Sequence, residues 1–263
     1  MSSTVPSGGP LLFLTGASSG IGMALAQAYV QRGWRVALCA RRMAPMAEWR
    51  ASQAQPERIH LYAVDVNDAL AMRDLADTVL RELGLPELVI ANAGFSVGVD
   101  LRHAQDLQAF ADILQTNVLG VAHTLQPFVR PMLERRSGQL VAIASVAGLR
   151  GLAGQGAYCA SKAAVITFME SLSAELRGTG VTASTINPGW VKTPLTASNR
   201  FPMPFALTAD DFARRAVRVI ARQPRLRTIP WQMAGVSWLL RWVPASWLAR
   251  ALAKKPRKQR REA

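Results

Sequence analysis

The chain has 263 residues, half of them hydrophobic, which is enough apolar material for a large core, and its formal net charge is +14. No internal repeat or low-complexity tract interrupts it, and no run of about twenty apolar residues indicates a membrane-spanning helix. Its two cysteines, Cys39 and Cys159, argue against a disulfide framework.

The amino terminus, residues 1–9, is small and polar, and we expect it to be flexible. It lacks the basic start and the apolar centre of a signal peptide. A cytoplasmic location is therefore the expectation.

A glycine-rich turn follows the first predicted strand, Leu11–Leu14. The turn reads Thr15-Gly16-Ala17-Ser18-Ser19-Gly20-Ile21-Gly22, and a helical pattern runs on to Arg32. Glycines let a backbone approach a pyrophosphate closely, and a helix N-terminus supplies N–H groups and a favourable dipole. Strand, turn and helix together predict a dinucleotide site, although the turn alone would also fit a tight loop.

The end of the second predicted strand, Arg35–Cys39, indicates which dinucleotide is bound. An acidic residue there would hydrogen-bond a ribose 2′-hydroxyl and repel a 2′-phosphate. Ala40 takes this place, and Arg41 and Arg42 follow, whose guanidinium groups suit a phosphate. We therefore predict NADP(H) rather than NAD(H), with Arg41 as the more direct contact. The alternative is that both arginines open a solvated helix.

The later segments alternate between strand and helix patterns. Further strand candidates are Ile59–Ala63, Leu88–Ala91, Gln139–Ala144, Thr182–Ile186 and a short one at Arg227–Trp231. The longest helical stretches lie around Leu107–Arg136 and Ala157–Arg177. This alternation predicts the α/β class, with residues 10–230 forming a single-domain, doubly wound Rossmann fold of about seven parallel strands.

Ser145, Tyr158 and Lys162 carry the chemistry that the sequence indicates. Tyr158 and Lys162 are four residues apart, so a helix places both on one face. An ammonium near a phenol lowers the phenol's pKa, and such a phenol can exchange a proton with an alcohol or ketone oxygen. Ser145 ends an apolar strand and can hydrogen-bond the same oxygen. A Tyr-x-x-x-Lys pair alone is weak evidence, because many helices contain one by chance.

The histidines, His60, His103 and His123, show no metal-ligand spacing, so we interpret them as surface or structural groups and expect no metal. Cys39 falls in a predicted buried strand. Cys159 adjoins Tyr158 but points away from its helical face.

Residues 231–253 form an apolar, tryptophan-rich segment, and residues 254–263 form a basic tail. A predicted helix here holds Trp238 and Trp242 one turn apart, and a second one runs from about Ala245 to Ala253. Such a segment suits an anionic membrane surface. It also suits packing on the core or on another subunit, followed by a solvated tail. No reading motif accompanies the basic run, so we expect no nucleic-acid binding.

These motifs, in this order, resemble the short-chain dehydrogenase/reductase superfamily from about Leu11 to Trp231. The resemblance adds Asp65-Val66, Asn92-Ala93-Gly94 and Pro188-Gly189 to the glycine turn and the Ser145 trio. Ala144 is a small departure, because a second serine is common there. The cofactor contacts that the resemblance implies are Gly16, Ser18, Ser19, Gly20, Ile21, Gly22, Arg41, Arg42, Asp65, Val66, Asn92, Ala93, Gly94, Tyr158, Lys162, Pro188, Gly189, Val191 and Thr193.

The resemblance implies an oxidoreductase that interconverts a carbonyl and a secondary alcohol by hydride transfer with NADP(H). Tyr158 would act as general acid or base, Ser145 would hold the substrate oxygen, and Asn117 would position a relay water. Lys162 would lower the tyrosine pKa and bind the nicotinamide ribose.

Residues from about 194 to 207 match a mobile substrate lid in the same family. The apolar stretch Phe201–Phe205 favours a hydrophobic substrate, although the segment could equally pack on the core. Relatives commonly pair through two long helices, so a homodimer or homotetramer is expected.

Two alternatives remain at this point. The fold can also serve as a non-catalytic NADPH-sensing or scaffold protein. A membrane-associated lipid or steroid reductase is a narrower possibility within the enzyme class.

Overall fold

A seven-stranded parallel sheet forms the centre of the computed structural model, which describes residues 8–197, 199, 202–244, 246–247, 250 and 258–260. Its strand order is β3-β2-β1-β4-β5-β6-β9. The strands are β1 (Leu11–Thr15), β2 (Arg35–Cys39), β3 (Ile59–Tyr62), β4 (Leu88–Ala91), β5 (Gly138–Ile143), β6 (Val181–Pro188) and β9 (Leu226–Ile229). This confirms the predicted doubly wound Rossmann sheet, whose order reverses between β1 and β4, where such folds bind ligands.

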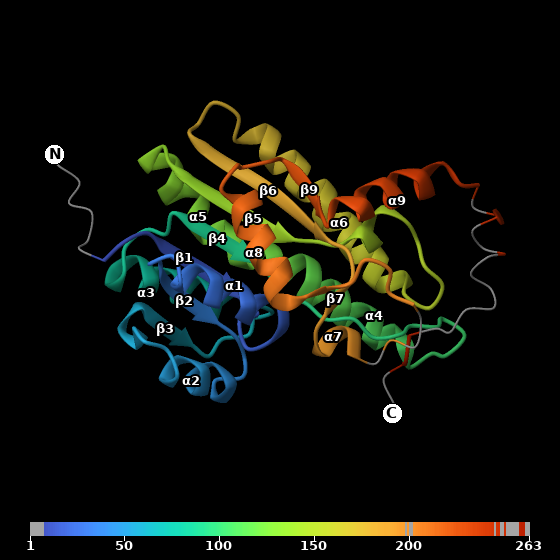
Figure 1. Ribbon diagram of the computed structural model, residues 1–263, viewed down its shortest axis with the longest axis horizontal. Helices are drawn as coiled ribbons and strands as arrows, with labels where there is room; N and C mark the ends of the chain where they lie inside the picture. Colours follow the sequence, from blue (N-terminus) through green and yellow to red (C-terminus); the bar gives the residue numbers. More distant parts are fainter. Residues whose placement is uncertain are drawn as a thin grey trace.

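Helices cover both faces of the sheet (Figure 1). They are α1 (Gly20–Val30), α2 (Ala44–Ala51), α3 (Ala69–Glu82), α4 (Asp106–Leu114), α5 (Gly120–Arg135), α6 (Gly156–Glu175), α7 (Pro194–Ala197), α8 (Ala209–Ile220) and α9 (Trp231–Trp242). Alternate strand residues enter two cores: Leu11 and Phe13 pack with α3, α5 and α6, whereas Leu12 and Leu14 pack with α1 and α8. Burial on both faces explains why the strands read as continuous apolar runs.

The helix predicted around Leu107–Arg136 is divided. It consists of α4 and α5 joined by a π-helical turn, η2 (Gln115–Leu119). Such turns often occur at functional sites. Asn117 lies in this turn and is fully buried.

The strand predicted at Arg227–Trp231 ends at Ile229 instead. Pro230 has no N–H to donate to a strand ladder and immediately precedes α9, so Trp231 begins that helix. Two short parallel strands, β7 (Val191–Lys192) and β8 (Leu207–Thr208), were not predicted and flank the segment interpreted as a lid. Within the part of the chain that the structure describes, no helix has the length and apolar character needed to span a bilayer.

Candidate active site

The turn between β1 and α1 requires glycine at two positions. A Cβ at Gly22 would lie 2.2 Å from the carbonyl oxygen of Gly16. A Cβ at Gly16, whose φ is +69°, would lie 2.7 Å from the Cα of Ala93. A side chain fits neither position, so the backbone at this turn is left accessible to a ligand.

Asn92, which follows β4, fixes this turn. Its Nδ2 donates to the carbonyl oxygens of Thr15 at 3.0 Å and Gly16 at 3.2 Å. Ser19, the N-cap residue of α1, makes no side-chain capping bond, so the first N–H groups of the helix remain open to an anion. The turn therefore has the shape and the donors that a pyrophosphate group needs.

Two arginines stand beside the turn where the second strand ends. Arg42 Nη2 lies 3.4 Å from Ser18 Oγ and 3.3 Å from Ser19 Oγ. Arg41 pairs instead with Asp65, with Nη1 and Oδ2 3.7 Å apart. Both arginines line the same pocket, and Arg42 is the one held against the glycine turn.

A pocket of about 820 Å³ connects the glycine turn with the residues predicted to be catalytic. It lies at the carboxyl ends of the strands, where open α/β sheets bind ligands. All nineteen positions listed above as implied cofactor contacts line it, and so does Ser145. Asn117 is the exception among the predicted site residues.

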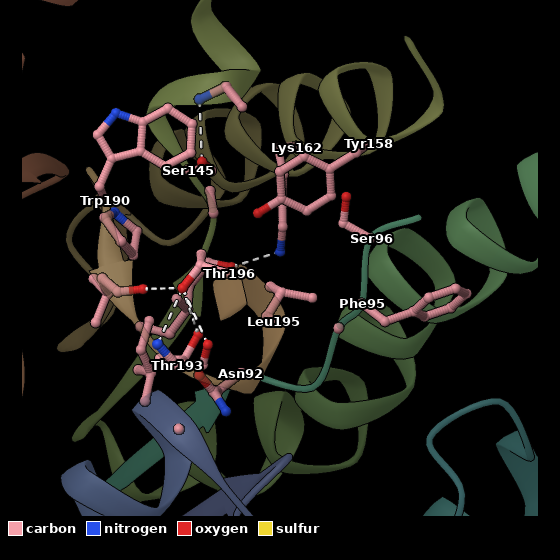
Figure 2. A pocket seen from close by; sticks show the side chains of 18 of the residues that line it. Asn92, Phe95, Ser96, Ser145, Tyr158, Lys162, Trp190, Thr193, Leu195 and Thr196 are labelled. Atoms are coloured by element: carbon pink, nitrogen blue, oxygen red, sulfur yellow. Dashed lines mark hydrogen bonds between the residues drawn. The ribbon is translucent and has the colours of Figure 1, made fainter. Parts of the chain in front are cut away.

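Ser145, Tyr158 and Lys162 surround one space in this pocket (Figure 2). Ser145 begins a short 3-10 helix, η3 (Val146–Leu149), and its Oγ accepts a hydrogen bond from the Ala147 N–H at 3.1 Å. Tyr158 and Lys162 both come from α6, with Lys162 Nζ 5.9 Å from the centre of the tyrosine ring. Lys162 Nζ donates to the carbonyl of Ile143, at the end of β5, at 2.9 Å.

Burial shifts the pKa values of both Tyr158 and Lys162. It raises the pKa of Tyr158 to about 12, and a hydrogen bond with Ser145 opposes this rise only in part. Burial also lowers the pKa of Lys162 to about 8, which weakens the tendency of that amine to carry a charge. Burial therefore disfavours the charged forms of both groups, and the role of Lys162 in making the phenol acidic stays a prediction.

Asn117 lies behind the pocket wall. Its Nδ2 donates to the Phe95 carbonyl and to Ser161 Oγ, both at 3.0 Å, and its Oδ1 accepts from the Phe95 N–H at 2.9 Å. The side chain thus ties the segment after β4 to α6. The predicted role of holding a relay water stays a prediction.

The lid segment borders the pocket where it is described. Leu195, Pro202 and Pro204 line the cavity, whereas Phe205 is exposed. Phe201 lies outside the described residues. The mobility of the lid segment and its influence on the choice of substrate remain predictions.

Other parts of the wall were missed by sequence reasoning. One face of α9 lines the pocket, so this helix of the tryptophan-rich segment is part of the site. Trp190 could have been found, since it directly follows Pro188-Gly189. The missed lining residues include Phe95, Trp190, Met233, Val236, Ser237 and Leu240.

The basic tail differs from the solvated tail expected above at residues 258–260, which the structure describes. Lys258 is buried and lines the pocket, and Arg260 forms an ion pair with Asp106. Asp106 is almost fully buried, and a buried carboxylate is costly without a cation beside it. Most of the helix predicted at Ala245–Ala253, and the rest of the tail, lie outside the described residues.

Comparison with known proteins agrees with this geometry. A family model described as short chain dehydrogenase matches residues 11–203. An uncharacterized oxidoreductase of Myxococcus xanthus is 41% identical over 222 residues, which cover 84% of this chain and 87% of that protein. A short-chain dehydrogenase from Streptomyces avermitilis superposes with a TM-score of 0.76 at 25% identity, covering 94% and 99% of the two chains. A serine dehydrogenase complexed with NADP+ has the same fold, with a TM-score of 0.76 at 24% identity over 83% and 94%.

Proposed function

This chain belongs to the short-chain dehydrogenase family and is one of its oxidoreductases, and we propose that it interconverts a carbonyl compound and a secondary alcohol with NADP(H). The observation that supports this proposal best is the meeting of Ser145, Tyr158 and Lys162 in the pocket that also contains the glycine turn. A proton donor would thereby adjoin the proposed dinucleotide site.

The residues present fit the proposed cofactor. The glycine turn and the N-terminus of α1 would hold the pyrophosphate, and Arg41 and Arg42 would hold the 2′-phosphate. Lys162 would bind the nicotinamide ribose, and the loop from Pro188 to Thr193 the nicotinamide amide. When bound in its reduced form, the cofactor supplies hydride to the carbonyl carbon.

Ser145 and Tyr158 would act on the carbonyl oxygen. Ser145 Oγ accepts from the Ala147 N–H and also hydrogen-bonds Tyr158, so the two hydroxyl groups lie together where they would contact that oxygen. Tyr158, with its raised pKa, is protonated at neutral pH and donates its proton as negative charge develops. In the reverse direction the phenolate would accept the proton of an alcohol.

A panel of ketones and aldehydes tests the proposal directly. The purified chain is mixed with NADPH and each compound, and consumption of NADPH is followed by its absorbance. We expect turnover of at least some apolar carbonyl compounds. Tight NADPH binding without turnover of any compound would favour the non-catalytic sensing or scaffold role instead.

Arg41→Asp is expected to change cofactor preference. The new carboxylate would repel a 2′-phosphate and accept a hydrogen bond from a 2′-hydroxyl. We expect kcat/KM for NADPH to fall about ten- to hundredfold relative to that for NADH, the usual value of a charged hydrogen bond. Arg73→Asp is a matched control, because it makes the same change on the exposed face of α3, outside the pocket. An unchanged ratio in Arg41→Asp, or a wild type that prefers NADH, would contradict the assignment.

The outer face of α9 carries exposed tryptophans that we infer contact a second copy of the chain. Trp238 and Trp242 are 66% and 73% exposed, with ring centroids 6.3 Å apart. Contiguous apolar surface of this kind is typical of interaction sites.

The double variant Trp238→Ser/Trp242→Ser is therefore expected to lower the mass measured by sedimentation equilibrium. Leu70→Ser, which removes an exposed leucine from α3, is expected to leave it unchanged. A wild type that is monomeric and floats with anionic liposomes would show a membrane contact instead.

A further inference from the structure

Residues 258–260, here called the docked tail, lie against the segment that follows β4. The Gly98 N–H donates to the Gln259 carbonyl at 2.7 Å, and Gly98 forms a parallel bridge with Arg260. A Cβ at Gly98 would lie 2.2 Å from the Lys258 carbonyl oxygen. The absence of a side chain at Gly98 thus leaves the space that the docked tail occupies.

An ion pair holds the docked tail in one register. Arg260 donates from Nε and Nη2 to the two carboxylate oxygens of Asp106, at 2.7 and 2.9 Å. Asp106 is 3% exposed and also accepts from the Asp100 N–H at 2.7 Å. Two parallel, charge-assisted hydrogen bonds to a buried carboxylate fix both position and orientation.

This anchoring brings the ammonium of Lys258 into the pocket wall. Lys258 is 8% exposed, and its Nζ donates to the Leu195 carbonyl at 3.3 Å. Among the residues that the structure describes, no carboxylate forms an ion pair with it, and burial lowers its pKa to about 8. Asp65, the one carboxylate among the described lining residues, stands beside Arg41, where β2 and β3 end. Lys258 is thus a buried cation with a neutral partner.

We propose that Lys258 binds a carboxylate of the substrate, so that this oxidoreductase acts on oxo acids or hydroxy acids whose remaining body is apolar. The proposal rests on the function proposed above. Leu195, Met233 and Leu240 supply apolar surface in the same pocket. One ammonium neutralises one carboxylate, whereas a phosphate ester carries up to about two negative charges. Arg260 acts through Lys258 and is a positioning residue.

The experiment compares medium-chain oxo acids, with the ketone at successive positions, with their methyl esters. NADPH consumption by the purified full chain gives kcat/KM for each compound, and the acid-to-ester ratio is the readout. We expect this ratio to exceed about ten in the wild type for at least one ketone position. In Lys258→Met it should fall about ten- to hundredfold, mainly through KM, because the variant loses a charged hydrogen bond.

Two further variants sharpen the experiment. Gly98→Ala places a methyl group where the docked tail lies and is expected to lower the ratio without altering Lys258 itself. Arg73→Met removes one positive charge from an exposed position on α3, outside the pocket, and is expected to leave the ratio unchanged.

A wild-type ratio near one, or a ratio that Lys258→Met leaves unchanged, would overturn the proposal. Reduction of the esters with NADPH would in that case leave the proposed function standing. If no compound of either kind is turned over, the panel of ketones and aldehydes described above decides the proposed function, and calorimetric titration of the same acids decides the role of Lys258. Binding at least tenfold weaker in Lys258→Met would support it, and equal binding or none would overturn it.

Discussion

Replacing Tyr158 by phenylalanine is expected to lower kcat for carbonyl reduction by at least about a hundredfold, because general acid catalysis commonly contributes ~10²–10⁴-fold. The ring stays, so α6 and the pocket wall should keep their packing. Affinity for NADPH should therefore change little. Steady-state kinetics measure the first effect, and fluorescence titration with NADPH measures the second.

Tyr62→Phe is the matched control for this variant. Tyr62 ends β3, is half-buried and lies outside the pocket, so loss of its hydroxyl should leave kcat unchanged. Activity in Tyr158→Phe above about a hundredth of the wild-type value would contradict the role of Tyr158 as proton donor.

Replacing Lys162 by methionine is expected to remove turnover to a similar extent while scarcely lowering the free energy of unfolding at pH 7. Lys162 is 4% exposed, and burial lowers its pKa from 10.5 to about 8. At about 1.4 kcal/mol for each pH unit, keeping this lysine charged costs about 3 kcal/mol. Methionine removes that cost but leaves the Ile143 carbonyl without its donor, which costs about 1–3 kcal/mol.

The pH dependence of the free energy of unfolding distinguishes the cost of burying a charged Lys162 from a change in side-chain packing, which would not vary with pH. Because the pKa of Lys162 is lower in the folded chain, its cost is fully present below about pH 8 and disappears as pH approaches 10.5. The wild type should therefore gain stability relative to Lys162→Met between about pH 8 and 10. Above about pH 10, Tyr158 acts in the opposite direction in both proteins, since its raised pKa keeps it neutral only when folded. Urea unfolding at several pH values measures the difference, and a constant difference would contradict the explanation.

The sheet and most of the candidate site could be predicted because both depend on local pattern. Each strand is a short apolar run that ends at a turn, and parallel strands bring their carboxyl ends to one edge. Residues that follow β1, β4 and β5 must therefore meet, which is why Gly16, Asn92 and Ser145 line one pocket. Tyr158 and Lys162 are four residues apart, so any helix through them brings both side chains to one face.

The features that escaped prediction depend on balances between distant groups. Burial raises the pKa of Tyr158, and the extent of burial follows from packing rather than from spacing. The docked tail needs a space at Gly98 and a buried carboxylate at Asp106, far away in sequence from Arg260. A basic run has the same composition whether it is solvated or anchored, so only the structure distinguishes the two.

The stretch that the family model matches ends at residue 203, ahead of α9 and the docked tail. The similarity measured over that stretch includes the glycine turn, Ser145, Tyr158 and Lys162, but it does not include Lys258, the residue proposed to bind the substrate carboxylate. Two relatives can therefore inherit the same redox machinery and diverge in what they reduce. Transferring a substrate assignment between them calls for a comparison of the counterparts of Gly98, Asp106 and Arg260, which reveal whether a similar cation reaches the site.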